Sequence, residues 1–130
     1  MRPYPPVVAA LWLLTGCGGQ DYDSPKALAE ALSASDVDCV ELREASVGDG
    51  SEASAECRTA DGRDIGLQVH DAAEQASTFV AGADLILQGT NRRALVHDGR
   101  WIVYVDDERT AREVQDAVGG EITQVAPEGG

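Results

Sequence analysis

The spacing of apolar and polar residues changes several times along the chain, and each change marks a predicted element. Ser24-Pro25 is typical of a helix start, because the side chain of Ser24 or Asp23 can cap the first turn and proline is tolerated at its first position. Leu28 and Leu32 follow at helical spacing, so we expect a helix that ends near Ser35.

Three segments with alternating apolar residues follow, and this period of two predicts half-buried strands. The second and third segments are joined through Asp61-Gly62. A two-residue loop there would place their apolar residues on opposite faces, whereas a three-residue loop over 60–62 brings them to one face. We therefore predict the longer loop, with Gly62 in the left-handed conformation. The resulting register pairs Cys57 with Ile65, Ala55 with Leu67, and Ala53 with Val69.

The chain then returns to helical spacing. Asp71 and Glu74 have the spacing of a helix N-cap. Residues 84–92 leave two alternatives open, because the apolar run 85–87 could prolong this helix or begin a strand. The residues expected to face inward are Ala72, Ala76, Phe79, Val80 and Ala83.

A hairpin is the clearest signal in the C-terminal half. Residues 94–97 and 101–105 flank Asp98-Gly99, a strong turn signal. Both strands are apolar on both faces, which predicts a central place in the sheet. Asp106 or Asp107 would cap a last helix that ends at Gly119-Gly120.

The predicted order α-β-β-β-α-β-β-α indicates one α+β domain over residues 24–122. Consecutive hairpins favour an antiparallel sheet of about five strands, and we expect the helices on one face, in a two-layer sandwich. Residues 17–23 would form a tether, and residues 123–130 a flexible tail. A chain of 130 residues has room for a single domain of this kind.

The first sixteen residues have the layout of a secretory signal peptide. Arg2 gives a positive start, Val7 to Leu14 form an apolar run, and the first acidic residue is Asp21. This run is shorter than the about 20 residues that a membrane-spanning helix needs. The run ends in Leu14-Thr15-Gly16-Cys17, which resembles the lipobox of bacterial lipoproteins.

This resemblance implies that the Cys17 thiol carries a diacylglycerol and that cleavage follows Gly16. The mature domain would then be extracytoplasmic, with its lipid anchor in the outer leaflet of the plasma membrane. An ordinary secretory signal that contains a cysteine is the alternative. In a host with an outer membrane, Gly18 after the cysteine would favour onward transport to that membrane.

The composition and two short motifs resemble those of small actinobacterial lipoproteins of unknown function. Arginine outnumbers lysine nine to one, which is typical of a GC-rich genome. The motifs are Asp98-Gly99-Arg100-Trp101 and a last helix that closes on Gly119-Gly120. The resemblance implies no assigned activity, no cofactor and no catalytic residue.

Cys39 and Cys57 are the thiols that remain once Cys17 is lipidated. Export places them in a compartment that permits disulfides, so we predict that they form one bridge. Two buried free thiols are the alternative. A redox-active role is disfavoured because the pair lacks the C-x-x-C spacing.

Charge narrows the range of partners. The sequence has 23 acidic and 10 basic side chains, a formal charge of −13, and loss of Arg2 with the signal would make it −14. This argues against nucleic acid as a partner, because phosphate binding needs clustered basic side chains. Anionic headgroups would repel such a domain, so it should stand off the membrane that holds it.

The sequence contains few groups for catalysis or metal binding. His70 and His97 are its two histidines; both lie in turn-like contexts, and we expect them to be partly exposed and to bind no metal. No serine lies in a nucleophile elbow. The acidic run 106–108 is explained by a helix cap and the helix dipole.

Two groups of residues are candidate partner contacts. Trp101 and Tyr104 lie on opposite faces of one predicted strand, so only one of them should point into the core beneath the helices. The other should lie on the open face of the sheet or under a loop. Arg92, Arg93 and Arg100 form the one basic cluster in an acidic sequence. Solvated charges in turns are one explanation, and a contact for an acidic partner or headgroup is the other.

These features predict a lipid-anchored, non-enzymatic binding or interaction module of the cell envelope. It would reach the membrane through diacylglyceryl-Cys17 and bind an envelope protein or a small ligand. The alternatives are a small envelope hydrolase that uses carboxylates and an inhibitor or immunity-type protein, whose negative charge would suit a basic partner.

Overall fold

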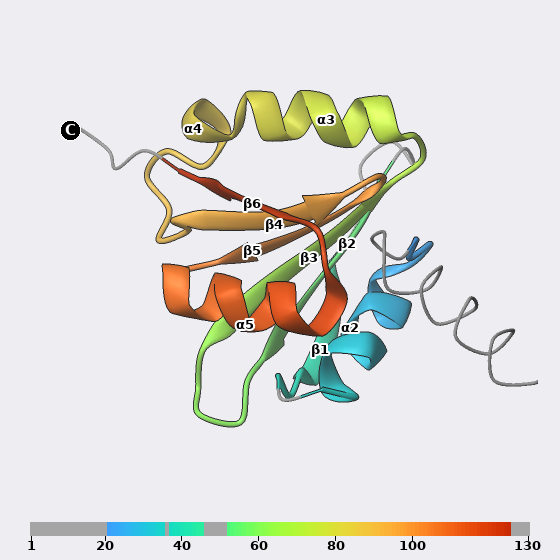
Figure 1. The fold of residues 1–130 in the computed structure, drawn as a ribbon, viewed down its shortest axis with the longest axis vertical. Helices are drawn as coiled ribbons and strands as arrows, with labels where there is room; N and C mark the ends of the chain where they lie inside the picture. The colour runs from blue at the N-terminus through green and yellow to red at the C-terminus, as the bar shows by residue number, and fades with distance from the viewer. Residues whose placement is uncertain (1–20, 36, 46–51, 126–130) are drawn as a thin grey trace, which may run out of the picture.

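The computed structural model describes residues 21–35, 37–45 and 52–125. The chain has an α+β fold with an antiparallel sheet, as predicted (Figure 1). Its helices are α2 (Pro25–Ser33), α3 (Ala73–Ala81), α4 (Ala83–Ile86) and α5 (Glu108–Val118). Its strands are β1 (Val40–Ala45), β2 (Glu52–Arg58), β3 (Asp64–His70), β4 (Ala94–Asp98), β5 (Trp101–Val105) and β6 (Glu121–Gln124).

The six strands lie in the order β1-β2-β3-β5-β4-β6, and every neighbouring pair is antiparallel. The strands β5 and β4 lie inside the sheet, as their apolar residues on both faces predicted. The β2–β3 register is also confirmed, with Cys57 opposite Ile65, Ala55 opposite Leu67 and Ala53 opposite Val69. Gly62 in the connecting loop has a φ of +92°, the left-handed conformation that we predicted.

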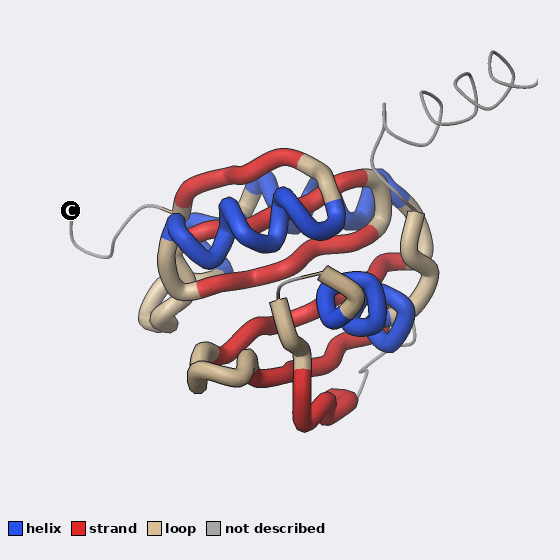
Figure 2. The backbone as a smooth tube through the Cα atoms, turned by 60° about the horizontal axis from the view of Figure 1, so that its bottom comes forward, coloured by secondary structure: helices blue, strands red, loops and turns tan. Residues whose placement is uncertain are grey.

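Helices cover both faces of the sheet, so the expected two-layer sandwich with helices on one face is wrong. The helices α2 and α5 contact each other on one face (Figure 2), while α3 and α4 cover the other (Figure 1). The physical reason lies in β4 and β5. Val96 and Val103 pack into the core beneath α2 and α5, and Leu95 and Ile102 pack into a second core beneath α3 and α4. Each of these apolar sets needs a cover, so one helical layer is not enough.

The strand β6 adds a sixth strand to the about five that were predicted, and it corrects the expectation of a loose tail from Thr123. It pairs with β4, and its register places Glu121 opposite His97 and Thr123 opposite Leu95. Gly119 and Gly120 have φ values of +82° and +93°, which return the chain from α5 to the sheet edge. Residues 126–130 of the predicted tail lie outside the described part of the chain.

The helix ends follow their sequence signals at two of three predicted N-caps. Ser24 accepts a hydrogen bond from the backbone N–H of Ala27 at 3.1 Å, and Asp107 accepts one from that of Thr110 at 2.7 Å. The predicted cap at Asp71 is wrong, because α3 begins one residue later with Ala72 at the N-cap and no side-chain hydrogen bond there. For the segment 84–92, the helical alternative is confirmed over its first residues, which belong to the short helix α4.

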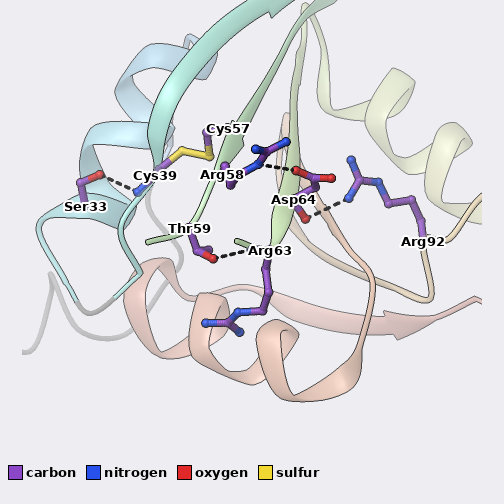
Figure 3. The surroundings of a disulfide bond; sticks show 8 residues. All are labelled: Ser33, Cys39, Cys57, Arg58, Thr59, Arg63, Asp64 and Arg92. Atoms are coloured by element: carbon purple, nitrogen blue, oxygen red, sulfur yellow. Dashed lines mark hydrogen bonds and ion pairs between the residues drawn. A yellow bond between two sulfur atoms is a disulfide. The ribbon is translucent and has the colours of Figure 1, made fainter. Parts of the chain in front are cut away.

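The predicted disulfide is present, and it joins Cys39 to Cys57 (Figure 3). The two Cα atoms are 5.3 Å apart. The backbone N–H of Cys39 also donates to the Ser33 hydroxyl at 3.0 Å. The bridge therefore ties the connection between α2 and β1 to the strand β2.

Gly66 leaves room for the aromatic ring that crosses β3. It lies opposite Tyr104, and an added Cβ would overlap Tyr104 Cδ2 and lie 3.3 Å from Arg92 Nη2. We expect Gly66→Ala to lower the free energy of unfolding by roughly 1–3 kcal/mol, because the packed ring must move. Urea denaturation measures this loss.

Gly82→Ala is the matched control, because its Cβ would meet nothing closer than Ile86 Cδ1 at 3.4 Å. Equal stability of the two variants would contradict the packing described for Tyr104.

Candidate functional site

A cavity of about 270 Å³ lies between α3 and the adjoining ends of β4 and β6. Helical spacing places four α3 residues on the face that borders it. In β4, His97 lies on the same face of the sheet as Leu95, which packs beneath α3, and the β4–β6 register places Glu121 beside His97. The lining residues are Ala73, Ala76, Ser77, Val80, His97, Asp98, Gly99 and Glu121.

The cavity combines an apolar side with acidic groups. Ala73, Ala76 and Val80 supply methyl groups, and Ser77 supplies a hydroxyl. The carboxylate of Glu121, which is paired with His97, supplies negative charge, whereas Asp98 lies at the end of β4 opposite Trp101. No lysine or arginine occurs among the described residues that line it.

His97 links two strands at the wall of the cavity. Its half-buried ring has Nε2 at 2.8 Å from the hydroxyl of Thr123 in β6. Burial lowers the pKa of His97 below the ordinary value of 6.5, and the charges of Glu121 and Asp98 oppose this shift. The lowered pKa favours the neutral form of the ring at pH 7.

We expect His97 to make the fold sensitive to mild acid. Its pKa is lower in the folded chain than in the unfolded chain, so the unfolded chain binds more protons as the pH falls through the ordinary value of 6.5. Stability from this group is therefore present above that pH and lost below it. Urea denaturation at pH 7.5 and 5.5 should show a smaller loss for His97→Gln than for the unsubstituted chain; an equal loss would contradict the burial of this ring.

A second cavity, of about 360 Å³, lies beside α5 and is lined by Ser35, Glu113, Asp116 and Ala117. Glu113 lies 3.1 Å from Arg63 Nη1 and 3.5 Å from Arg109 Nε. Arg63 also donates to the Thr110 hydroxyl, so it fastens the β2–β3 loop to α5. Because Glu113 is balanced by two arginines, this cavity gives no support to a hydrolase that uses paired carboxylates.

The three arginines predicted as a basic cluster do not come together. Arg92 and Arg93 precede β4, whereas Arg100 follows it at the opposite end of the strand. Arg92 lies 3.1 Å from Asp106 and donates to the backbone carbonyl of Asp64, and Arg93 donates to that of Thr90 at 2.9 Å. Sequence proximity was misleading here, because five strand residues separate the two groups in space.

The two aromatic candidates are both covered. Trp101 is 0% exposed and belongs to the core beneath α2 and α5. Tyr104 is half-buried on the opposite face, stacks on Phe79 of α3 with ring centroids 5.7 Å apart, and donates a hydrogen bond to Gln68. The expectation that one of them points away from a covered core is wrong, because α3 packs over the face that was expected to be open.

The histidines differ in their surroundings. His70 is buried beside Phe79, so its predicted partial exposure is wrong, whereas that of His97 is confirmed. Within the described residues, no three His, Cys, Asp or Glu side chains come together in a way that could hold a metal ion. In the acidic run, Asp107 caps α5, and the Thr110 backbone N–H lowers the pKa of its carboxyl.

Cys17 and the predicted signal segment 1–16 lie outside the described residues. In the part of the chain that is described, no helix has the length and apolar character to cross a bilayer. Comparison with known protein families, curated proteins and solved structures found no significant match to this chain.

Sequence reasoning missed the cavity beside α3. Its lining comes from α3, the end of β4 and the start of β6, and no strand was predicted at β6. The nearest signal in the sequence was His97, which lies at the end of the apolar run of β4, just before the Asp98-Gly99 turn.

Proposed function

We propose that this protein is an extracytoplasmic, lipid-anchored binding module of the cell envelope and not an enzyme. The anchor would be a diacylglyceryl group on Cys17, in the outer leaflet of the plasma membrane. The observation that carries this proposal is Leu14-Thr15-Gly16-Cys17 at the end of an apolar segment with a positive start.

Two features of the folded domain support the proposal. The Cys39–Cys57 disulfide suits an oxidising compartment outside the cytoplasm. The cavity beside α3 offers acidic and apolar groups to a small ligand, and its one imidazole already contacts Thr123. Binding therefore uses the geometry of this site more fully than catalysis does.

Cys17→Ser tests the anchor. In cells grown with a labelled fatty acid, we expect the unsubstituted chain to carry the label and to sediment with membranes. The variant should lose all detectable label and leave the membrane fraction, because two acyl chains supply the stable attachment.

A chain in which Cys39 and Cys57 are both replaced by serine is the matched control, because it loses thiols but keeps the acylation site. It should keep the label. Equal labelling and equal sedimentation of Cys17→Ser and the unsubstituted chain would contradict the anchor.

A further inference from the structure

The segment that leads from Cys17 is attached to the domain at the turn between β4 and β5. The ring of Tyr22 meets Trp101 edge to face, with ring centroids 5.6 Å apart, and it packs against the core beneath α2 and α5. The carboxylate of Asp21 accepts hydrogen bonds from Nε and Nη2 of Arg100, at 3.4 and 3.3 Å. The domain therefore holds the chain from Asp21 onward.

The aromatic contact is the stronger part of this attachment. The side chain of Asp21 is 71% exposed, and an ion pair so open to solvent is weak because water and salt screen it. Tyr22 instead lies against the fully buried indole of Trp101, in an arrangement that stabilises aromatic pairs. Two residues further on, Ser24 caps α2, so Tyr22 lies close to a fixed helix end. The attachment therefore depends mainly on Tyr22.

The contact leaves only a short free chain between Cys17 and the domain. Four residue steps separate Cys17 from Asp21, and they span at most about 14 Å at roughly 3.4 Å per residue. Without the contact, the free chain would run seven steps to the cap at Ser24 and would reach about 24 Å. The β4–β5 turn is therefore the end of the domain closest to the proposed acylated cysteine.

The strand β3 connects this end of the domain to the opposite one. Where β3 ends, the backbone N–H of His70 donates to the carbonyl of Arg100 in the β4–β5 turn at 2.8 Å. Where β3 begins, Asp64 follows the β2–β3 loop that contains Gly62 (Figure 1). Six residue steps separate Asp64 from His70, which is about 20 Å at roughly 3.3 Å per residue. The β2–β3 loop is therefore the end farther from Cys17.

The end near the tether is polar. Its turn consists of residues 98–100, an aspartate, a glycine and an arginine. Among the described residues, the exposed large apolar side chains are Val40, Leu85 and Ile86. Val40 pairs with Arg58 at the end of the β2–β3 loop, and α4, which carries the other two, lies away from the β4–β5 turn (Figure 1). Since insertion into hydrocarbon needs an apolar face, the turn fits the polar headgroup layer.

We propose that the docked tether turns the β4–β5 end of the domain toward the bilayer, at the level of the headgroups, and leaves the β2–β3 loop pointing outward. This inference rests on the proposed lipid anchor at Cys17, and it names the bilayer as the surface that this end of the domain faces. Anionic headgroups would repel the acidic domain, but the attached chain limits its withdrawal to about 14 Å. A partner outside the membrane would therefore meet the β2–β3 loop first.

The test uses the lipidated chain purified from membranes, in nanodiscs of phosphatidylcholine with a small fraction of lipid that carries a gadolinium chelate on its headgroup. Gadolinium broadens nearby amide resonances in NMR spectra, and the broadening falls steeply with distance. Gly99 in the β4–β5 turn and Gly62 in the β2–β3 loop are the two reporters. We expect at least about fivefold more broadening at Gly99, because about 20 Å separates the two ends. A soluble gadolinium chelate, added to discs without the gadolinium lipid, corrects for their different exposure to solvent.

Matched variants test the role of the docked segment. Tyr22→Ala removes the ring that holds the tether, so the ratio of broadening at Gly99 to that at Gly62 should fall at least about twofold as the free chain lengthens. Tyr22→Phe is the control, because it keeps the ring and should keep the ratio. Insertion of about eight Gly and Ser residues after Gly19 lengthens the tether without changing the folded domain, and it should also lower the ratio.

The outcomes separate this inference from the proposed anchor. A larger broadening at Gly99 that falls in Tyr22→Ala and persists in Tyr22→Phe supports the orientation. Equal broadening at the two glycines, or a ratio that neither Tyr22→Ala nor the longer tether changes, overturns it. Mass spectrometry of the same sample reports the lipid on Cys17 independently. An unmodified Cys17 overturns the anchor and this orientation with it, whereas a lipidated chain with equal broadening rejects the orientation alone.

Discussion

Trp101→Ala should lower the free energy of unfolding by about 3–5 kcal/mol, the usual cost of removing a large buried aromatic side chain. The indole is 0% exposed, and it is the largest fully buried side chain among the described residues. It packs against Tyr22, and an added Cβ on Gly120 would lie only 2.9 Å from its Cη2 atom. Its loss would therefore leave a cavity between the core, the tether and the start of β6.

This loss is a large part of the about 5–15 kcal/mol that stabilises a typical small domain. Urea denaturation of the full chain, followed by far-UV circular dichroism, measures it. Trp101→Phe should have an intermediate effect, because a smaller ring still fills part of the space. Leu85→Ala is the control: its side chain is 76% exposed, so the change should stay within about 0.5 kcal/mol. A Trp101→Ala chain as stable as this control would contradict the core described here.

Removal of the disulfide should cost about 3 kcal/mol, because the bridge restricts the unfolded chain. It joins residues 18 positions apart and links the segment before β1 to β2. The double variant Cys39→Ala and Cys57→Ala should unfold at a correspondingly lower urea concentration. A double replacement leaves no single thiol that could pair wrongly.

Reductant provides the matched control for this prediction. In a Cys17→Ser background, dithiothreitol should lower the stability of the disulfide-bonded chain toward that of the double variant and leave the double variant unchanged. Equal stability with and without dithiothreitol would show that the bridge contributes nothing.

Short-range signals in the sequence predicted several parts of the fold correctly. The apolar alternation around Asp61-Gly62 defined the β2–β3 register, because one face of the hairpin must meet the core. Ser24 and Asp107 predicted their helix caps, since a side-chain oxygen near the first turn satisfies a free N–H. Two cysteines in a segment expected to be exported predicted the bridge between Cys39 and Cys57.

The errors concern contacts between distant segments. The consecutive apolar residues of β4 and β5 require a cover on both faces of the sheet, which a single helical layer cannot provide. The helix α3 supplies the cover on the second face. The strand that contains Thr123 could not be predicted, because an alternation over four residues is too short to recognise. The position of this strand depends on the edge that β4 leaves open. The cavity beside α3 could not be predicted for the same reason, since Glu121 lies beside His97 only through the pairing of β6 with β4.

The lipid anchor at Cys17 is the central claim, and the most direct measurement of it is mass spectrometry of the N-terminal peptide of the protein purified from membranes. The account predicts a chain that begins at Cys17, after cleavage behind Gly16, with a diacylglyceryl group on the cysteine sulfur. A membrane-purified chain that keeps residues 1–16, or that carries an unmodified Cys17 thiol, would contradict it.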